Sequence, residues 1–109
     1  NVSESQLERM MEIDVDALSI DEAVPIALAK QIGARRHLVV IGNISPTRTL
    51  LMGKKDQIEE ATRRCIDDGV DAVAPGCSLE TYTPLENLIA MTETAKRYGT
   101  KRAKAGRRR

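Results

Sequence analysis

The stretch "DAVAPGCSLETYTPLEN", residues 71–87, contains the transition that decides the fold. The apolar run over 70–74 predicts a buried strand. Thr83 and Glu86 have the three-residue spacing of a capping box, with a proline between them at the first helical position, so a helix is expected to follow. The Pro-Gly pair before Cys77 ends the strand and places a thiol where strand and loop meet. The stretch therefore predicts a strand–loop–helix unit.

Similar units precede this one. "VDALSI" is a short apolar run led by a β-branched residue, and "HLVVIG" is continuously apolar, as is typical of a parallel strand buried on both faces. A capping box of Asp56 and Glu59 is expected to open the third helix. The predicted elements, in chain order, are a helix over 3–12, a strand over 15–20, a helix over 21–33, a strand over 37–42, a helical turn over 46–51, a helix over 56–69, a strand over 70–74 and a helix over 84–99.

Strands that alternate with helices imply right-handed βαβ units and a parallel sheet. The fold class is therefore α/β, with three consecutive parallel βα units. A sheet of three strands leaves two edges of unpaired backbone groups. An eight-stranded (β/α)8 barrel of the TIM type would remove those edges, so the chain is expected to form part of such a barrel. The alternative is a non-catalytic α/β piece that associates with itself through the open edges.

Composition excludes several classes of protein. The 109 residues suit one small domain, and the chain has no Trp or Phe and only two Tyr, which argues against stacking on single-stranded nucleic acid. No segment approaches the roughly 20 apolar residues of a membrane span. Without a visible signal peptide, and with two cysteines that do not form a disulfide framework, a cytoplasmic location is expected.

Charge is concentrated at the C-terminal end. Residues 100–109 hold six of the 17 Lys and Arg residues, although the net charge of the chain is only +1. A basic tail can bind RNA, DNA or acidic lipid, but this one lacks a hydrophobic pattern on which to fold. We therefore expect a solvated, disordered tail over 100–109 after a folded segment over 1–99, and we do not expect nucleic-acid binding.

Three predicted strands end at residues that can carry chemistry, because reactive groups in parallel α/β folds gather at the carboxyl ends of the strands. Cys77 could act as a metal ligand or nucleophile, or be a small buried hydrophobe. Asp21 could ligate a metal, act as a base or cap the next helix. Gly42, Asn43 and Gly76 could offer groups that hold an anionic substrate, or form simple turns.

Cys65 and His37 are not expected to belong to this edge. Cys65 lies on the apolar stripe of its helix, which indicates core packing. His37 lies at the start of its strand, at the opposite end from Cys77. A Cys–His catalytic pair within the chain is therefore not expected, nor is a complete zinc site, which needs at least three protein ligands.

Three segments carry a resemblance to a known family: "VDALSID", "VVIGNISPTRTLLMG" and "GVDAVAPGCSLETYTPLENLIAMTETAKRYG". They resemble the last third of the uroporphyrinogen decarboxylase superfamily, and most closely its methylcobamide:coenzyme M methyltransferase branch. The resemblance covers nearly all of residues 1–99. It implies that this segment is the C-terminal part of a (β/α)8 barrel.

The resemblance also implies a metal site. The methyltransferase branch holds zinc through a His-x-Cys segment and a later Cys at the end of the last strand, and Cys77 matches that later Cys. The His-x-Cys pair would fall just before Asn1, and Asp21 stands near a position from which a carboxylate can approach the zinc. The chain alone is therefore expected to be inactive.

The implied reaction moves a methyl group from methylcobalamin, carried by a partner corrinoid protein, to a thiol such as coenzyme M, as in methanogenesis. Gly42, Asn43 and Gly76 are expected to orient the substrate. The decarboxylase branch tends to have a Gly-His-Gly-like turn where this sequence has Pro-Gly-Cys, which favours the methyltransferase branch. The alternative that remains is a metal-free carbon–carbon lyase acting on a tetrapyrrole.

Overall fold

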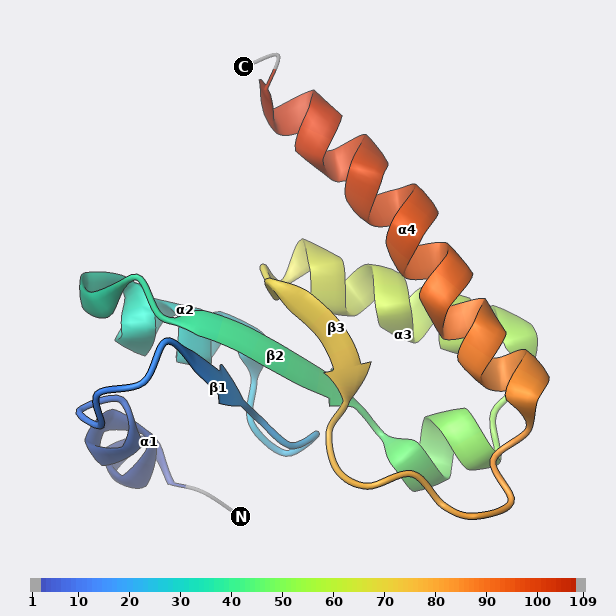
Figure 1. Ribbon diagram of the computed structural model, residues 1–109, viewed down its shortest axis with the longest axis horizontal. Helices are drawn as coiled ribbons and strands as arrows, with labels where there is room; N and C mark the ends of the chain where they lie inside the picture. Colours follow the sequence, from blue (N-terminus) through green and yellow to red (C-terminus); the bar gives the residue numbers. More distant parts are fainter. Residues whose placement is uncertain (1–2, 108–109) are drawn as a thin grey trace.

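The computed structural model describes residues 3–107 (Figure 1). Helices and strands alternate along it after a first short helix. The elements are α1 (Glu4–Met10), β1 (Ala17–Ser19), α2 (Ile26–Gly33), the 3-10 turn η1 (Ala34–Arg36), β2 (Val39–Ile44), the π-helical turn η2 (Pro46–Leu51), α3 (Lys55–Asp67), β3 (Ala72–Pro75) and α4 (Leu85–Arg107).

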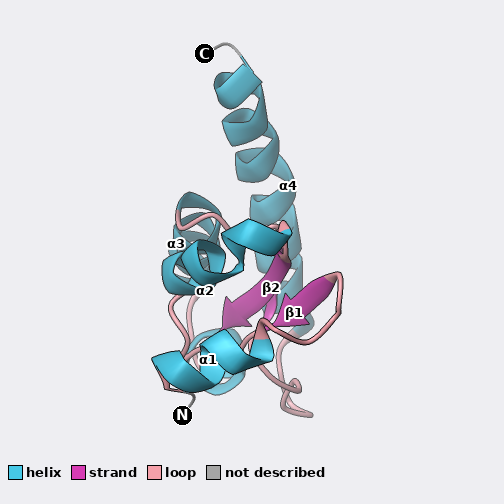
Figure 2. Cartoon of the chain, turned by 90° about the vertical axis from the view of Figure 1, so that its left-hand side faces the viewer, coloured by secondary structure: helices cyan, strands magenta, loops and turns pink. Residues whose placement is uncertain are grey.

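The three strands form one parallel sheet in the order β1-β2-β3. Ala17 pairs with Val39, and Ile41 pairs with Ala72, so β2 is the central strand. Figure 2 shows α2 and α3 on the same side of the strands. The predicted α/β class with three consecutive parallel βα units is confirmed.

Only one face of the sheet is covered by the part of the chain that the structure describes. Val40 and Ile44 on β2 are buried, whereas Val39 is 39% exposed and its partner Ala17 is exposed too. The expectation that both faces of this strand are buried is therefore wrong within residues 3–107. The uncovered face carries Ala17 and Ser19 of β1 beside Val39 of β2, all of them exposed.

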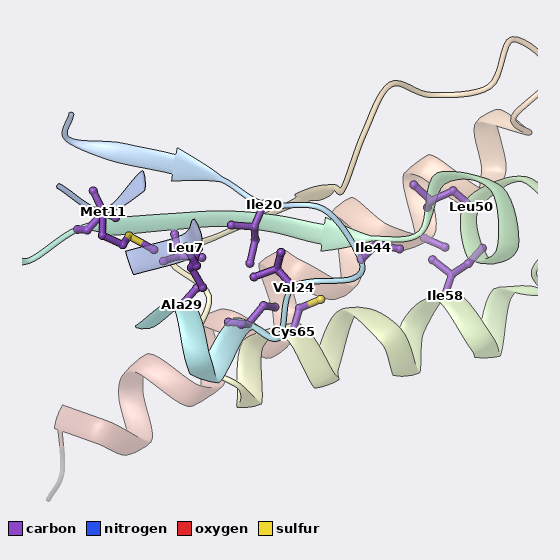
Figure 3. Packing of buried hydrophobic residues seen from close by; sticks show 13 residues of the cluster. Leu7, Met11, Ile20, Val24, Ala29, Ile44, Leu50, Ile58 and Cys65 are labelled. Carbon is purple, nitrogen blue, oxygen red and sulfur yellow. The ribbon is translucent and has the colours of Figure 1, made fainter. Parts of the chain in front are cut away.

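The core lies between the sheet and its helices (Figure 3). Ile58 on α3 is fully buried, and full burial of such a side chain stabilises the fold by about 1.5–3 kcal/mol. The predicted core role of Cys65 is confirmed, since this residue is 7% exposed within the same cluster. Further members of the cluster are Leu7, Met11, Ile20, Val24, Ala29, Val40, Ile44 and Leu50.

The central strand lies two residues later than predicted. His37 is exposed, and its backbone adopts the left-handed conformation (φ 53°), so the chain is still turning at this residue. The backbone N–H of Leu38 then donates to the Gly33 carbonyl at 3.2 Å. At its other end the strand continues through Gly42 to Ile44. Glycine therefore does not end the strand, because pairing with β3 continues to Ile44.

The two predicted capping boxes are wrong. Lys54 is the N-cap residue of α3, and its backbone N–H donates to Gln57 Oε1 at 2.8 Å. Glu59 instead lies 3.9 Å from Lys55 in an ion pair. Before α4, the Thr83 hydroxyl donates to the Glu80 carbonyl at 2.7 Å. Both helices begin at other residues than the spacing predicted, α3 at Lys55 and α4 at Leu85.

Helix α4 continues well past the predicted end at Gly99. The structure places residues 100–107 in the same helix, which contradicts a disordered tail over that range; residues 108–109 lie outside the described part. Two contacts with α3 support the extension, because Tyr98 donates to Asp67 Oδ1 at 2.9 Å and Arg102 Nε lies 3.3 Å from it. Among the helices over 3–107, α4 included, none has the length and apolar composition needed to span a membrane.

Candidate functional site

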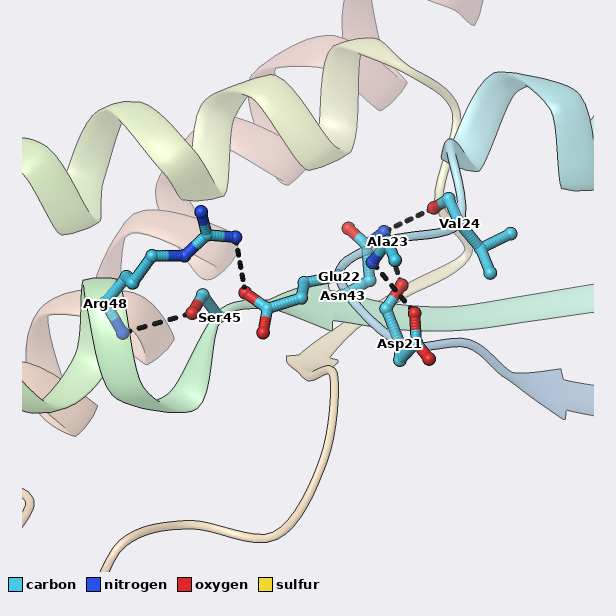
Figure 4. A network of polar contacts seen from close by, with 7 residues as sticks. All are labelled: Asp21, Glu22, Ala23, Val24, Asn43, Ser45 and Arg48. Carbon is cyan, nitrogen blue, oxygen red and sulfur yellow. Dashed lines mark hydrogen bonds and ion pairs between the residues drawn. The ribbon is translucent and has the colours of Figure 1, made fainter. Parts of the chain in front are cut away.

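The loop after β1 is shaped by the carboxylate of Asp21. Its Oδ1 accepts a hydrogen bond from the backbone N–H of Ala23 at 2.8 Å, while Ile20 before it is buried (Figure 4). The side chain therefore caps a tight turn, and α2 begins only at Ile26, not at Asp21 as predicted. One carboxylate oxygen is used in this way, and the exposed residue retains the other.

Asn43, at the carboxyl end of β2, joins this loop to the sheet. Its Nδ2 donates to the Val24 carbonyl at 2.7 Å and to the Asp21 carbonyl at 3.1 Å (Figure 4). Its Oδ1 accepts from the Cys65 thiol at 3.7 Å. The amide is thus engaged with protein groups on both sides, and its predicted contact with substrate stays a prediction.

Two glycines allow the ends of the three strands to approach one another. A Cβ atom on Gly42, which has φ +151°, would lie 2.8 Å from the Ile20 carbonyl oxygen. A Cβ atom on Gly76 would lie 2.8 Å from the backbone nitrogen of Glu22. The N–H of Gly76 also donates to the Ile44 carbonyl at 2.8 Å, so the loop after β3 is held against the ends of both other strands.

Cys77 follows Gly76 directly and is exposed at this edge. The alternative of a small buried hydrophobe therefore does not apply to it. Because Gly76 touches the Asp21–Glu22 backbone, the thiol and the Asp21 carboxylate belong to loops that meet. The structure thus brings together the predicted residues at one end of the sheet.

The donors available here fit part of a zinc site. Thiolate sulfur and carboxylate oxygen are both zinc ligands, but a zinc site takes at least three protein ligands. Within residues 3–107 no group of three or more His, Cys, Asp and Glu side chains could hold a metal ion. Cys77, with or without Asp21, can therefore supply only a share of the ligands.

His37 lies apart from this edge, as predicted, whereas Cys65 packs in the core and contacts Asn43 from that side. Burial raises the pKa of the Cys65 thiol, with a weaker opposing effect from its hydrogen bond to Asn43. A buried thiol with a raised pKa is a poor metal ligand, because the thiolate is the ligand form. His37 is exposed ahead of Val39, where β2 begins, and so lies at the other end of the strand.

The polar contacts that surround Glu22 were not predicted from the sequence. This carboxylate lies 3.1 Å from Arg48 Nη2 (Figure 4). Hydrogen bonding with Ser45 and then with Arg48 lowers its pKa. Farther along, the Thr47 hydroxyl donates to Glu80 Oε1 at 3.1 Å and tethers the loop that follows Cys77. The predicted helical turn over 46–51 contains Arg48, but its ion pair with Glu22 joins residues 26 positions apart, which spacing along the sequence does not indicate.

Comparisons with known proteins agree with the resemblance seen in the sequence. Residues 1–98 match the family model for uroporphyrinogen decarboxylase (URO-D). The methylcobamide:CoM methyltransferase MtbA of Methanosarcina mazei is 34% identical over 84 residues, covering 77% of this chain and 24% of that protein. MtaA of Methanosarcina barkeri, which has the same descriptive name, is 37% identical over 94 residues, covering 84% of this chain and 27% of that protein.

A solved structure gives the same result. A methyltransferase from Methanosarcina mazei superposes with a TM-score of 0.79 at 30% identity, over 84% of this chain and 27% of that one. The chain thus spans about a quarter of the length of the relatives it matches. Since the family model covers nearly the whole sequence, the chain belongs to the uroporphyrinogen decarboxylase family.

Proposed function

We propose that this chain is the C-terminal part of a (β/α)8 barrel enzyme that transfers a methyl group from a methylated corrinoid protein to a thiol such as coenzyme M. The observation that carries the proposal is the exposed thiol of Cys77 at the carboxyl edge of the sheet, beside the loop that holds Asp21. The similar proteins MtbA and MtaA are methylcobamide:CoM methyltransferases, which supports the same reaction.

In the complete site Cys77 would be one ligand of a zinc ion, Asp21 would offer its remaining carboxylate oxygen as a second, and the other ligands would come from outside residues 3–107. Bound zinc supplies one chemical effect, which is deprotonation of a coordinated thiol whose ordinary pKa is about 8.5. A thiolate is the nucleophilic form. Because Cys77 and Asp21 are fewer than the three protein ligands that a zinc site needs, we expect this chain by itself to be inactive.

Other residues of the chain shape the loops around the position where the substrate thiol would react. Gly42 and Gly76 lack side chains at two points of close backbone approach, so the strand ends can meet without a Cβ atom between them. Their backbone groups are proposed to orient an anionic substrate. Asn43 holds the Asp21 loop against the sheet through its two donated hydrogen bonds. Cys77 is exposed, so a substrate thiol bound beside it would be open to a bulky methyl donor carried by another protein.

The test is a zinc measurement on the complete protein that carries this chain. We expect Cys77→Ser to lower zinc affinity by at least about a hundredfold, since loss of an outer-shell partner alone costs roughly 10–100-fold. The matched control is Cys65→Ser, a sulfur-to-oxygen change in the core, which should leave zinc affinity nearly unchanged. A wild-type protein that contains no zinc would contradict the proposal.

A second candidate is a metal-free carbon–carbon lyase that acts on a tetrapyrrole, and the match to the uroporphyrinogen decarboxylase model favours it. The same zinc measurement separates the two candidates, combined with assays of methyl transfer to coenzyme M and of tetrapyrrole decarboxylation. Decarboxylation that persists after metal removal and in Cys77→Ser would support this second reaction and reject the first.

A further inference from the structure

A groove lies between α3 and α4, away from the edge that carries Cys77. Its volume is ≈ 530 Å³, and its lining includes Arg63 on α3 and Thr94, Arg97 and Lys101 on α4. Tyr98 also lines the groove, and its hydroxyl donates a hydrogen bond to Asp67, the last residue of α3. All residues that line the groove belong to α3 and α4, and none belongs to the loops that carry Asp21 and Cys77.

The hydroxyl of Thr94 has an unusual environment. Thr94 is 5% exposed, and its Oγ1 has no hydrogen-bond partner within the described residues. Three other helical threonines, Thr62, Thr92 and Thr100, each donate to the carbonyl four residues earlier. A buried polar group without a partner is unfavourable, and a ligand that enters the groove could satisfy it.

Positive charge surrounds this hydroxyl. Arg63, Arg97 and Lys101 are exposed and form no ion pair within residues 3–107. One carboxylate, Glu59, also lines the groove, but it pairs with Lys55 at 3.9 Å. Asp67, beside the groove, accepts a hydrogen bond from Tyr98 and pairs with Arg102. The groove therefore has excess positive charge from two helices.

The positions on α4 place these groups together. Thr94, Arg97 and Lys101 follow one another at spacings of three and four residues, so they share one face of the helix. Arg63 reaches the same groove from α3. Two guanidinium groups, an ammonium group and a hydroxyl donor thus converge on one open space, which is a combination that matches the oxygens of phosphate groups.

We propose that this groove binds a small phosphorylated ligand with two or more phosphate groups. Its volume falls in the range of roughly 300–1,000 Å³ that small-molecule sites occupy. The α4 face lacks the large apolar side chains of a membrane-surface helix, and only one aromatic residue, Tyr98, is present for base stacking. The proposal does not depend on the proposed methyl transfer, since the groove shares no lining residue with the edge that carries Cys77.

The test is isothermal titration calorimetry of the complete protein with inorganic pyrophosphate. We expect saturable binding with one site per chain, weakened at least about tenfold in the double variant Arg97→Gln/Lys101→Gln, because each charged partner lost is a strong hydrogen bond lost. The matched control is Lys104→Gln, which removes a cation of the same helix outside this groove and should leave affinity within about twofold.

A second variant protects the test from effects of folding. Thr94→Val removes the unpaired hydroxyl at nearly constant volume, so the protein should be at least as stable as wild type while pyrophosphate binds several-fold more weakly. The proposal is overturned if millimolar pyrophosphate does not bind saturably, if Lys104→Gln weakens binding as much as the double variant, or if Thr94→Val leaves affinity unchanged. Binding of polyuridylic acid that pyrophosphate does not displace would assign the surface to nucleic acid instead and would also overturn it.

Discussion

The backbone of Gly76 lies directly against that of Asp21: a Cβ atom at position 76 would be 3.2 Å from the Asp21 Cα and 2.8 Å from the next backbone nitrogen. Because both neighbours are backbone atoms, they cannot turn aside as a flexible side chain would. This contact is what joins the loop that carries the thiol of Cys77 to the loop after β1. It spans two strands that do not pair with each other.

Gly76→Ala should therefore destabilise the protein by about 1–3 kcal/mol, the cost of forcing atoms into a filled space. The free energy of unfolding from urea denaturation measures the effect. The control is Gly99→Ala within α4, where the nearest atom to the added Cβ is 3.9 Å away and the higher helix propensity of alanine should stabilise by up to about 1 kcal/mol. Equal stability of Gly76→Ala and wild type would show that the two loops do not touch in solution.

Asn43→Ala should cost about 1–3 kcal/mol, because the carbonyl groups of Val24 and Asp21 lose their donor. Urea denaturation again gives the free energy of unfolding. The control is Gln31→Ala, an exposed amide on α2, where a surface substitution should change stability by no more than about 0.5 kcal/mol. If Asn43→Ala were as mild as this control, Asn43 would not hold the loop, and its amide would be free for substrate.

Stability should fall at acidic pH partly through Asp71. Partial burial tends to raise the pKa of Asp71, but the hydrogen bonds from Lys30 and from the Val40 N–H outweigh it and hold the pKa below its ordinary value of 3.8. Since the pKa is lower in the folded state, the contribution to stability is present above the unfolded pKa and is lost as pH falls through the folded value.

The measurement is the free energy of unfolding of wild type and Asp71→Asn between pH 7 and pH 2. The destabilisation caused by Asp71→Asn should be largest near neutral pH and should shrink below pH about 4 as the wild-type carboxylate becomes protonated. Asp14→Asn, at an exposed position before β1, serves as the control. A difference between wild type and Asp71→Asn that stays constant with pH would contradict the assigned ionic role.

Residues 1–109 expressed alone should associate with one another. The outer edges of β1 and β3 are unpaired in the described residues, and Val39 lies on the uncovered face of the sheet. Val39→Lys should shift the population toward monomer in sedimentation equilibrium, whereas Ile13→Lys, at a residue that is 56% exposed and outside the sheet, should change it little. A stable monomer at high protein concentration would argue against association through these surfaces.

The order and type of the elements followed from the sequence, because continuous apolar runs and helical spacings are local patterns. "HLVVIG" predicted the central parallel strand, and the apolar stripe that contains Cys65 predicted a core position. Because Cys77 follows the third predicted strand, the sequence also predicted that this residue lies at the carboxyl end of the sheet. Local rules failed at boundaries, as at Lys54, where the side chain of Gln57 and not the expected acidic pair caps the helix.

The rest depended on contacts between residues far apart in the chain. Spacing along the sequence cannot indicate that Asn43 bonds the carbonyls of residues about twenty positions earlier, nor that Asp67 holds α4 beyond Gly99. The sequence by itself determined which segments become strands and helices and which residue types end each strand. Only the tertiary structure decided which of those ends touch, because backbone approach at Gly76 and paired side chains exist only once distant segments have packed together.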